Sequence, residues 1–210
     1  MTTISGYVDG ILDGTIEPQQ QARFLRIVSD ETKRLSRLVR NMLEISRMQA
    51  KEGFSEDEKT RFDICECAGQ VLLSFEQRIV QKALEVEVQF PEDPLYTMAN
   101  QDAIVQVIYN LVDNAVKFCR QDGKLQLSIA DANGKIRITV SNDGPAIPSS
   151  ELPFVFERFH KTDKSRNRKQ EGWGLGLYIV KTLVCSHGED ISVASQEGRT
   201  AFTFTLPIVP

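Results

Sequence analysis

The chain has 210 residues, of which 41% are apolar and 26% charged, and its formal net charge is −4. This composition is ordinary for one or two globular domains, and the acidic balance argues against a nucleic-acid partner. No apolar run approaches the ~18 residues that cross a bilayer, and the start of the chain carries no secretion signal. We therefore expect the chain as it stands to be cytoplasmic. Its four cysteines include no Cys-x-x-Cys metal pair, which favours reduced structural thiols.

Residues 1–50 predict a helical hairpin, with a shorter helix over 2–13 and a longer one over 18–50. Apolar residues in the longer helix recur three to four apart or at multiples of that spacing and form a seam: Phe24, Val28, Leu35, Leu38, Met42 and Ile45. A seam of this length has to pack on the shorter helix, on a second copy of the chain, or on both. The pattern predicts a dimeric four-helix bundle. The alternative is a helix folded back on the rest of the chain.

Residues 51–60 are polar and break the helical period, so they predict a linker to a second domain over 61–210. Strands are expected at 60–64, 84–90, 124–131, 135–141, 190–195 and 200–206, and helices at 65–82, 100–119 and 175–186. This order predicts an α+β fold in which helices cover one face of a mixed sheet, an α/β sandwich.

The predicted helix over 100–119 carries a polar stripe. Asn110, Asn114 and Lys117 lie at i, i+4 and i+7 and therefore share one face. Carboxamide oxygens can complete the octahedral shell of Mg²⁺ together with triphosphate oxygens and water, and a lysine can meet phosphate charge. An isolated asparagine here would instead indicate a polar residue in helix packing.

Three further motifs follow along the chain. Asn142-Asp-Gly144-Pro-Ala146 has the composition of a tight turn after a strand. The aromatic pair Phe156 and Phe159 precedes a run rich in lysine and arginine, which alone would indicate a solvated loop. Glycines at 172, 174 and 176 then lead into a helix, whose first turn offers free N–H groups to phosphate.

Together the four motifs resemble, in order and spacing, the Bergerat-type ATP-binding fold shared by histidine kinases, gyrase B, Hsp90 and MutL. The resemblance implies a site for ATP and Mg²⁺. Asn110 and Lys117 would act in catalysis, and Asn110 and Asn114 would hold the metal. The implied nucleotide contacts are Asn114, Asn142, Gly144, Ala146, Phe159, Lys161, Arg166, Gly172, Gly174, Leu175, Gly176, Leu177 and Thr200.

The chain departs from the family pattern at three positions. Asn142 stands where the family has the aspartate that accepts a hydrogen bond from the adenine amino group, and Ala146 and Arg199 stand where it has glycines. Asp143 could take the adenine role through a shift of one residue. In the ATPase relatives a glutamate activates water at the position of Asn110, and a carboxamide is no general base, which favours a kinase over a hydrolase.

The first 50 residues resemble the dimerisation and phosphotransfer helices of sensor histidine kinases. In that family the phosphoacceptor histidine lies less than two helical turns before a stretch like Thr2-Thr-Ile-Ser-Gly-Tyr7, so the resemblance implies that the acceptor is supplied outside this chain. We expect the cytoplasmic catalytic portion of such a kinase, acting on a response regulator receiver domain as a homodimer, with any membrane anchor in upstream segments. The alternatives are a non-catalytic dimeric regulator that pairs with kinases or response regulators and, less favoured by the long helices, a serine kinase of the anti-sigma type.

Overall fold

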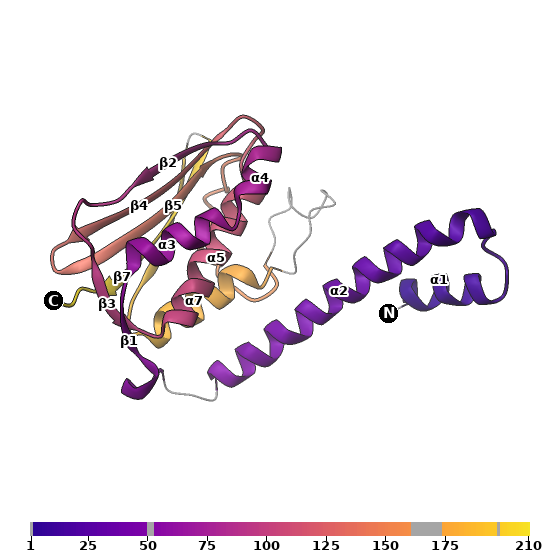
Figure 1. The fold of residues 1–210 in the computed structure, drawn as a ribbon, viewed down its shortest axis with the longest axis horizontal. Helices are drawn as coiled ribbons and strands as arrows, with labels where there is room; N and C mark the ends of the chain where they lie inside the picture. Colours follow the sequence, from indigo (N-terminus) through magenta and orange to yellow (C-terminus); the bar gives the residue numbers. More distant parts are fainter. Residues whose placement is uncertain (1, 50–52, 161–173, 197) are drawn as a thin grey trace. The chain divides into compact units, whose positions relative to one another are not determined.

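The computed structural model describes residues 2–49, 53–160, 174–196 and 198–210. The chain forms two compact units, Met1–Arg47 and Met48–Pro210 (Figure 1). Within the described residues, no helix combines the length and the apolar character needed to cross a membrane.

The first unit consists of helix α1 (Thr2–Leu12) and the first 30 residues of helix α2 (Pro18–Gln49). Pro18 occupies the first position of α2, where its missing N–H costs no hydrogen bond. The rings of Tyr7 and Phe24 pack 4.9 Å apart and join the two helices. Several large apolar side chains of this unit remain exposed: Leu12, Leu25, Ile27, Leu35 and Val39.

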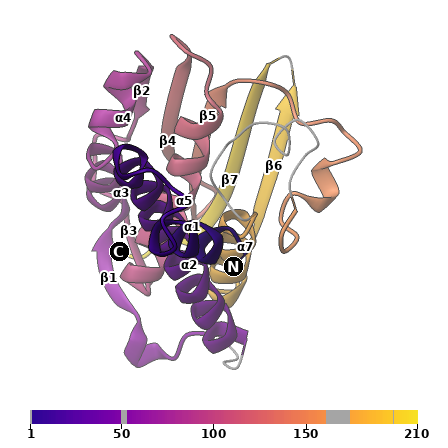
Figure 2. The same cartoon turned by 90° about the vertical axis from the view of Figure 1, so that its right-hand side faces the viewer.

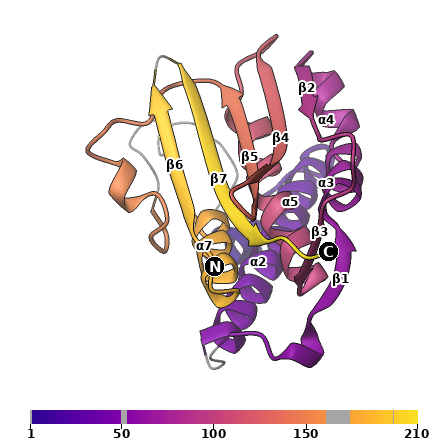
Figure 3. The same cartoon turned by 90° about the vertical axis from the view of Figure 1, so that its left-hand side faces the viewer.

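The second unit is built on a five-stranded mixed sheet. Its strands are β2 (Glu85–Gln89), β4 (Lys124–Ala132), β5 (Lys135–Asp143), β7 (Arg199–Pro207) and β6 (Ile191–Gln196), in that spatial order (Figures 2 and 3). Strands β2 and β4 are parallel, and the other neighbours are antiparallel. In β4, β5 and β7 buried positions alternate with more exposed ones along most of each strand, so each presents one apolar face.

Helices α3 (Ile64–Leu73), α5 (Gln101–Phe118) and α7 (Gly176–Ser186) cover that apolar face (Figure 1). The side chains of Asp63 and Asn100 accept hydrogen bonds from the first-turn amides Cys65 N and Ala103 N, which caps α3 and α5. The predicted α+β sandwich, with helices on one face of a mixed sheet, is confirmed.

Two local predictions need correction. The single helix expected over 65–82 is two helices, α3 and α4 (Glu76–Gln81), because the chain breaks at Ser74 and Phe75. Phe75 is 1% exposed, and the break lets this ring enter the core and pack 4.9 Å from the ring of Tyr109.

The second correction concerns a strand that we did not predict. Strand β3 (Tyr96–Ala99) pairs antiparallel with β1 (Thr60–Asp63) in a small separate sheet. Its four residues are too few for a clear alternation of apolar and polar positions. Two short 3₁₀ turns, Glu56–Glu58 and Leu152–Phe154, were also not predicted.

Candidate nucleotide-binding site

Helix α5 presents two different faces. Ile104, Val107, Ile108 and Leu111 are 0% exposed and fill the core. The polar residues Asn110, Asn114 and Lys117 are half-buried on the side away from those positions. The apolar face fixes the helix against the sheet, and this anchoring holds the polar stripe in place.

The start of α7 lies beside the polar stripe of α5. A side-chain carbon at Gly176, the first residue of α7, would lie 3.6 Å from Oδ1 of Asn110. The preceding Leu175 is 2% exposed and anchors this turn, whereas Leu177 is half-buried. The carboxamide of Asn110 therefore lies beside the positive end of a helix, whose first N–H groups have no partner within the helix.

The residues that flank the lysine- and arginine-rich run lie side by side. The amide of Phe159 donates to the carbonyl of Gly174 at 3.0 Å. Gly174 has a φ of +70°, and a Cβ there would lie 2.5 Å from the carbonyl oxygen of His160. Phe159 is 47% exposed. The candidate residues Lys161, Arg166 and Gly172 lie outside the described residues.

At the end of β5, Asn142 is turned into the interior. It is 5% exposed and pairs across the strands with Thr200, which is also 5% exposed. The hydroxyls of Thr200 and Ser195 lie 2.8 Å apart, and Ser195 Oγ accepts from the amide of Ile147 at 2.9 Å. Nδ2 of Asn142 donates to the carbonyl of Asp143 at 3.2 Å, which leaves Oδ1 as the acceptor end of the carboxamide.

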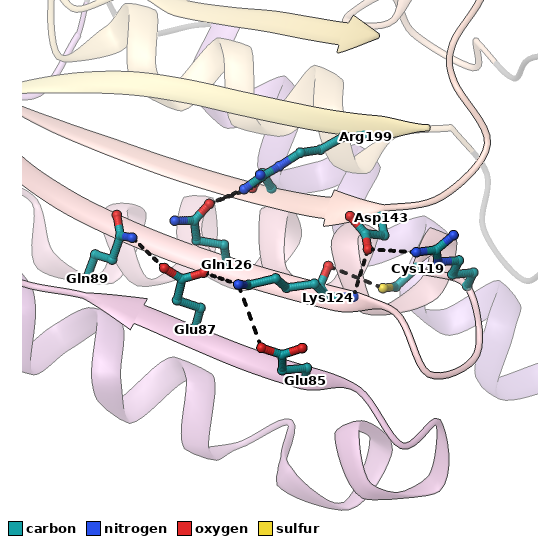
Figure 4. A network of polar contacts seen from close by, with 10 residues as sticks. Glu85, Glu87, Gln89, Cys119, Lys124, Gln126, Asp143 and Arg199 are labelled. Atoms are coloured by element: carbon teal, nitrogen blue, oxygen red, sulfur yellow. Dashed lines mark hydrogen bonds and ion pairs between the residues drawn. The ribbon is translucent and has the colours of Figure 1, made fainter. Parts of the chain in front are cut away.

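Asp143 points to the opposite, outer face of the sheet (Figure 4). Its Oδ2 accepts from the backbone amide of Lys124 at 3.2 Å and lies 3.3 Å from the guanidinium of Arg120. Burial raises the pKa of the nearby Cys119 thiol, and the negative charge of Asp143 raises it further. This placement favours Asn142 over Asp143 as the interior polar group at the end of β5.

Arg199 also lies on the outer face. Its Nη2 donates to Ser141 Oγ at 2.8 Å and to Oε1 of Gln126, so the side chain crosses β5 toward β4 (Figure 4). Strand alternation directs Arg199 outward and its neighbour Thr200 inward. Arg199, which stands where the family has a glycine, therefore does not enter the interior of the unit.

Gly144 connects the end of β5 with the end of α5. A Cβ at this position would lie 2.5 Å from the carbonyl oxygen of Phe118, and the Gly144 amide donates to the carbonyl of Gly198 at 2.7 Å. Ala146, two residues on, is exposed. The structure thus brings together Asn110 with Gly176, Phe159 with Gly174, and Asn142 with Thr200.

A groove of about 590 Å³ lies on another side of α7. Its walls are Phe156, Glu157, Arg158, Tyr178, Lys181, Thr182 and Cys185. It includes Phe156 of the aromatic motif but none of the residues predicted to contact nucleotide, so we do not assign it to the nucleotide site.

Three participants were missed from the sequence. Ser195 supports Thr200, the carbonyl of Gly198 accepts from Gly144, and the carbonyl of Phe118 faces Gly144. Of these three, only Ser195 could have been recognised from the sequence, because it is a polar residue at an inward position of β6. The contacts of backbone carbonyls cannot be recognised from residue types.

Two protein families match parts of this chain. Residues 99–210 match the family described as histidine kinase-, DNA gyrase B- and HSP90-like ATPase, and residues 1–51 match the His Kinase A (phospho-acceptor) domain. The sensor histidine kinase WalK of Bacillus subtilis is 35% identical over 99% of this chain. The sensor protein SrrB of Staphylococcus aureus is 31% identical, also over 99%. The chain spans 34% and 35% of the lengths of these two proteins.

Solved structures agree as well. The catalytic domain of histidine kinase ThkA matches with a TM-score of 0.64 and 29% identity, over 71% of this chain and 95% of that one. ThkA in complex with response regulator protein TrrA matches with a TM-score of 0.78 and 25% identity, over 100% of this chain and 57% of that one. Histidine kinase AdeS of Acinetobacter baumannii shares the fold, with a TM-score of 0.79 over 100% of this chain and 95% of that one, at 24% identity.

The helical hairpin and the α/β sandwich together match the catalytic portions of histidine kinases. The chain belongs to the histidine kinase-, DNA gyrase B- and HSP90-like ATPase family.

Proposed function

We propose that the chain is the catalytic portion of a two-component sensor histidine kinase, which binds MgATP and transfers the γ-phosphoryl group to a histidine outside this chain. The observation that carries the proposal is the closeness of Asn110 to Gly176. It places a metal-binding type of side chain beside a helix N-terminus, where backbone N–H groups attract phosphate oxygens.

The nucleobase end of the site would lie at Asn142. Its buried carboxamide oxygen is an acceptor for an amino group, and the hydroxyls of Thr200 and Ser195 lie beside it on neighbouring strands. Gly144 would let the backbone come close to the base, with Ala146 beyond it. The resemblance assigns the contacts to the triphosphate to Phe159, Lys161, Arg166, Gly172, Gly174, Leu175, Gly176 and Leu177.

The donor set suits a metal held jointly with the nucleotide. Asn110 and Asn114 offer neutral oxygens from one face of α5, and the described part of the chain contains no cluster of three histidine, cysteine or acidic residues that could hold an ion. Mg²⁺ keeps several water ligands and shares phosphate oxygens in such sites. When bound, it would neutralise charge on the transferring phosphoryl group.

Asn110 also favours transfer of the phosphoryl group over hydrolysis of ATP. Asn110 cannot take a proton from water at neutral pH, so water in the site would stay a poor nucleophile. Lys117 would stabilise negative charge on the phosphates.

His160 and His187 of the ATP-binding unit both contact other residues of that unit. Nε2 of His187 accepts from the Asn100 amide at 3.1 Å and Nδ1 lies 2.8 Å from the Leu183 carbonyl. Nε2 of His160 lies 2.9 Å from a carboxylate oxygen of Glu151, although the angles are not those of a hydrogen bond. These contacts support an acceptor histidine outside this chain.

Two partners follow for the proposed kinase. The exposed apolar residues Leu25, Leu35 and Val39 of α2 support a homodimer through the helical unit, because such side chains gain from burial. The match to ThkA bound to TrrA supports a response regulator receiver domain as the phosphoryl recipient.

The test is nucleotide binding and transfer by Asn114→Ala, with Gln101→Ala as the matched control. Both variants remove a carboxamide from α5, but Gln101 is exposed at the helix start. We expect Asn114→Ala to weaken MgATP binding by at least about tenfold. It should also abolish transfer of γ-labelled phosphate to a separate helical domain that carries a phosphoacceptor histidine. Unchanged binding and transfer by Asn114→Ala would refute the proposal.

A further inference from the structure

The side chain of Lys82 caps the C-terminus of α5. Lys82 follows α4, and its Nζ lies 2.8 Å from the carbonyl oxygen of Val116, 2.9 Å from that of Lys117 and 2.9 Å from that of Cys119. Carbonyls in the last turn of a helix have no partner within the helix, and that end carries negative partial charge. An ammonium group has three donors, which matches three carbonyls.

The turn that Lys82 caps is also held from its other side. The amide of Arg120 donates to the Asp143 carbonyl at 3.0 Å, and the Phe118 carbonyl lies against Gly144. The backbone also links the two helix ends, since the Asp122 amide donates to the Lys82 carbonyl at 3.2 Å. The end of α5 is therefore fixed between Lys82 and the end of β5.

We propose that Lys82 is a positioning residue for the nucleotide site, which acts by holding the last turn of α5 and thereby Lys117. The inference rests on the proposed function, in which Lys117 meets phosphate charge. Without Lys82, three carbonyls lose a charged donor and the last turn frays more readily.

Helix α4 supplies a matched control. Nη1 of Arg78 lies 2.6 Å from Oδ1 of Asp113, in the middle of α5, and both side chains are more than 40% exposed. Arg78→Met therefore removes a cation that also joins α4 to α5, but it leaves the last-turn carbonyls capped. An exposed ion pair of this kind contributes little.

The experiment compares the affinity of the full chain for MgATP in Lys82→Met, Arg78→Met, Lys117→Met and the double variant Lys82→Met with Lys117→Met. Circular dichroism confirms that each variant is folded, and Lys82→Gln, which keeps one donor, replaces Lys82→Met if that variant is unfolded. We expect Lys82→Met to weaken binding on the order of tenfold and Arg78→Met by less than about twofold. Because Lys82 acts through Lys117, the double variant should bind as Lys117→Met does.

Three results overturn the inference. The first is an equal loss in Lys82→Met and Arg78→Met. The second is a further loss in the double variant as large as that in Lys82→Met alone, which would show a general structural effect. The third is unchanged affinity in Lys117→Met combined with a loss in Asn114→Ala, which overturns the role of Lys82 and leaves the ATP site standing. Unchanged affinity in Asn114→Ala refutes the proposed function itself.

Discussion

Gly144 lies so close to the carbonyl of Phe118 that a Cβ at position 144 would be 2.5 Å from that oxygen. The backbone at Gly144 therefore lies against the backbone at Phe118, which joins the end of β5 to the end of α5. Neither can move without shifting one of the two elements that carry the candidate site.

We expect Gly144→Ala to lower the free energy of unfolding by about 1–3 kcal/mol, because the new carbon overpacks this contact. It should also weaken MgATP binding, since Asn142 and Lys117 would move apart. Calorimetric unfolding and titration measure the two effects. Gly69→Ala is the control: no atom lies within 4 Å of a Cβ there, and the residue lies inside α3. This variant should gain about 0.5–1 kcal/mol. Equal stability of both variants would contradict the prediction.

Because position 142 is an asparagine, we expect the site to discriminate only weakly between ATP and inosine triphosphate. Its carboxamide can accept from a 6-amino group or, after turning, donate to a 6-oxo group, whereas a carboxylate can only accept. We expect the natural chain to bind MgATP and magnesium inosine triphosphate within about fivefold. Asn142→Asp should widen that preference for ATP to more than about tenfold, because the hydrogen bond becomes charge-assisted.

The affinities of both nucleotides for each variant check this prediction. Asp143→Asn is the matched control, since Asp143 faces Arg120 and the amide of Lys124 on the outer face. Strong selection for ATP by the natural chain would contradict the role given to Asn142.

Arg199→Gly should leave nucleotide binding nearly unchanged. The side chain lies on the outer face, bound to Ser141 and Gln126, and does not reach the interior beside Thr200. We expect MgATP affinity within about twofold of the natural chain and a loss of up to about 1 kcal/mol in stability. A gain of tenfold or more in affinity would mean that the arginine obstructs the site.

We expect the free energy of unfolding to decrease as the pH falls, because His187 takes up a proton. Burial lowers its pKa below the ordinary value of 6.5, and the charge of Lys59 adds to this, while the bond to the Leu183 carbonyl and the charge of Glu189 act in the opposite direction. The fold prefers the neutral ring, whose Nε2 accepts from Asn100 N. Its contribution is complete above pH 6.5 and is lost as the pH falls, because the unfolded chain binds the proton first.

Denaturant unfolding at a series of pH values from about 7.5 to 5 measures this loss. His187→Gln can keep an acceptor for Asn100 N and a donor for Leu183 O, yet it does not titrate. The variant should lose less stability than the natural chain over this range. Equal slopes would exclude His187 as the titrating group.

Local patterns in the sequence were sufficient for much of the fold. Apolar spacing located α5 and α2 to within one residue at each end, and alternation located β5 and β7 within two. The helix break at Phe75 and strand β3 were missed, because burial of one ring and the pairing with β1 depend on distant parts of the chain. The spacing of Asn110 and Asn114 on one helix face also needed no tertiary information.

The tertiary structure decided what the sequence left open. Pairing of β5 with β7 turns Asn142 inward beside Thr200 and Asp143 outward beside Arg199, and a shift of one residue would reverse both. The cap that Lys82 places on α5 joins residues 34 to 37 apart. Side-chain spacing within a helix or strand is fixed by local backbone geometry, so the sequence determines it. Contacts between elements depend on how the chain packs, and only the folded structure decides them.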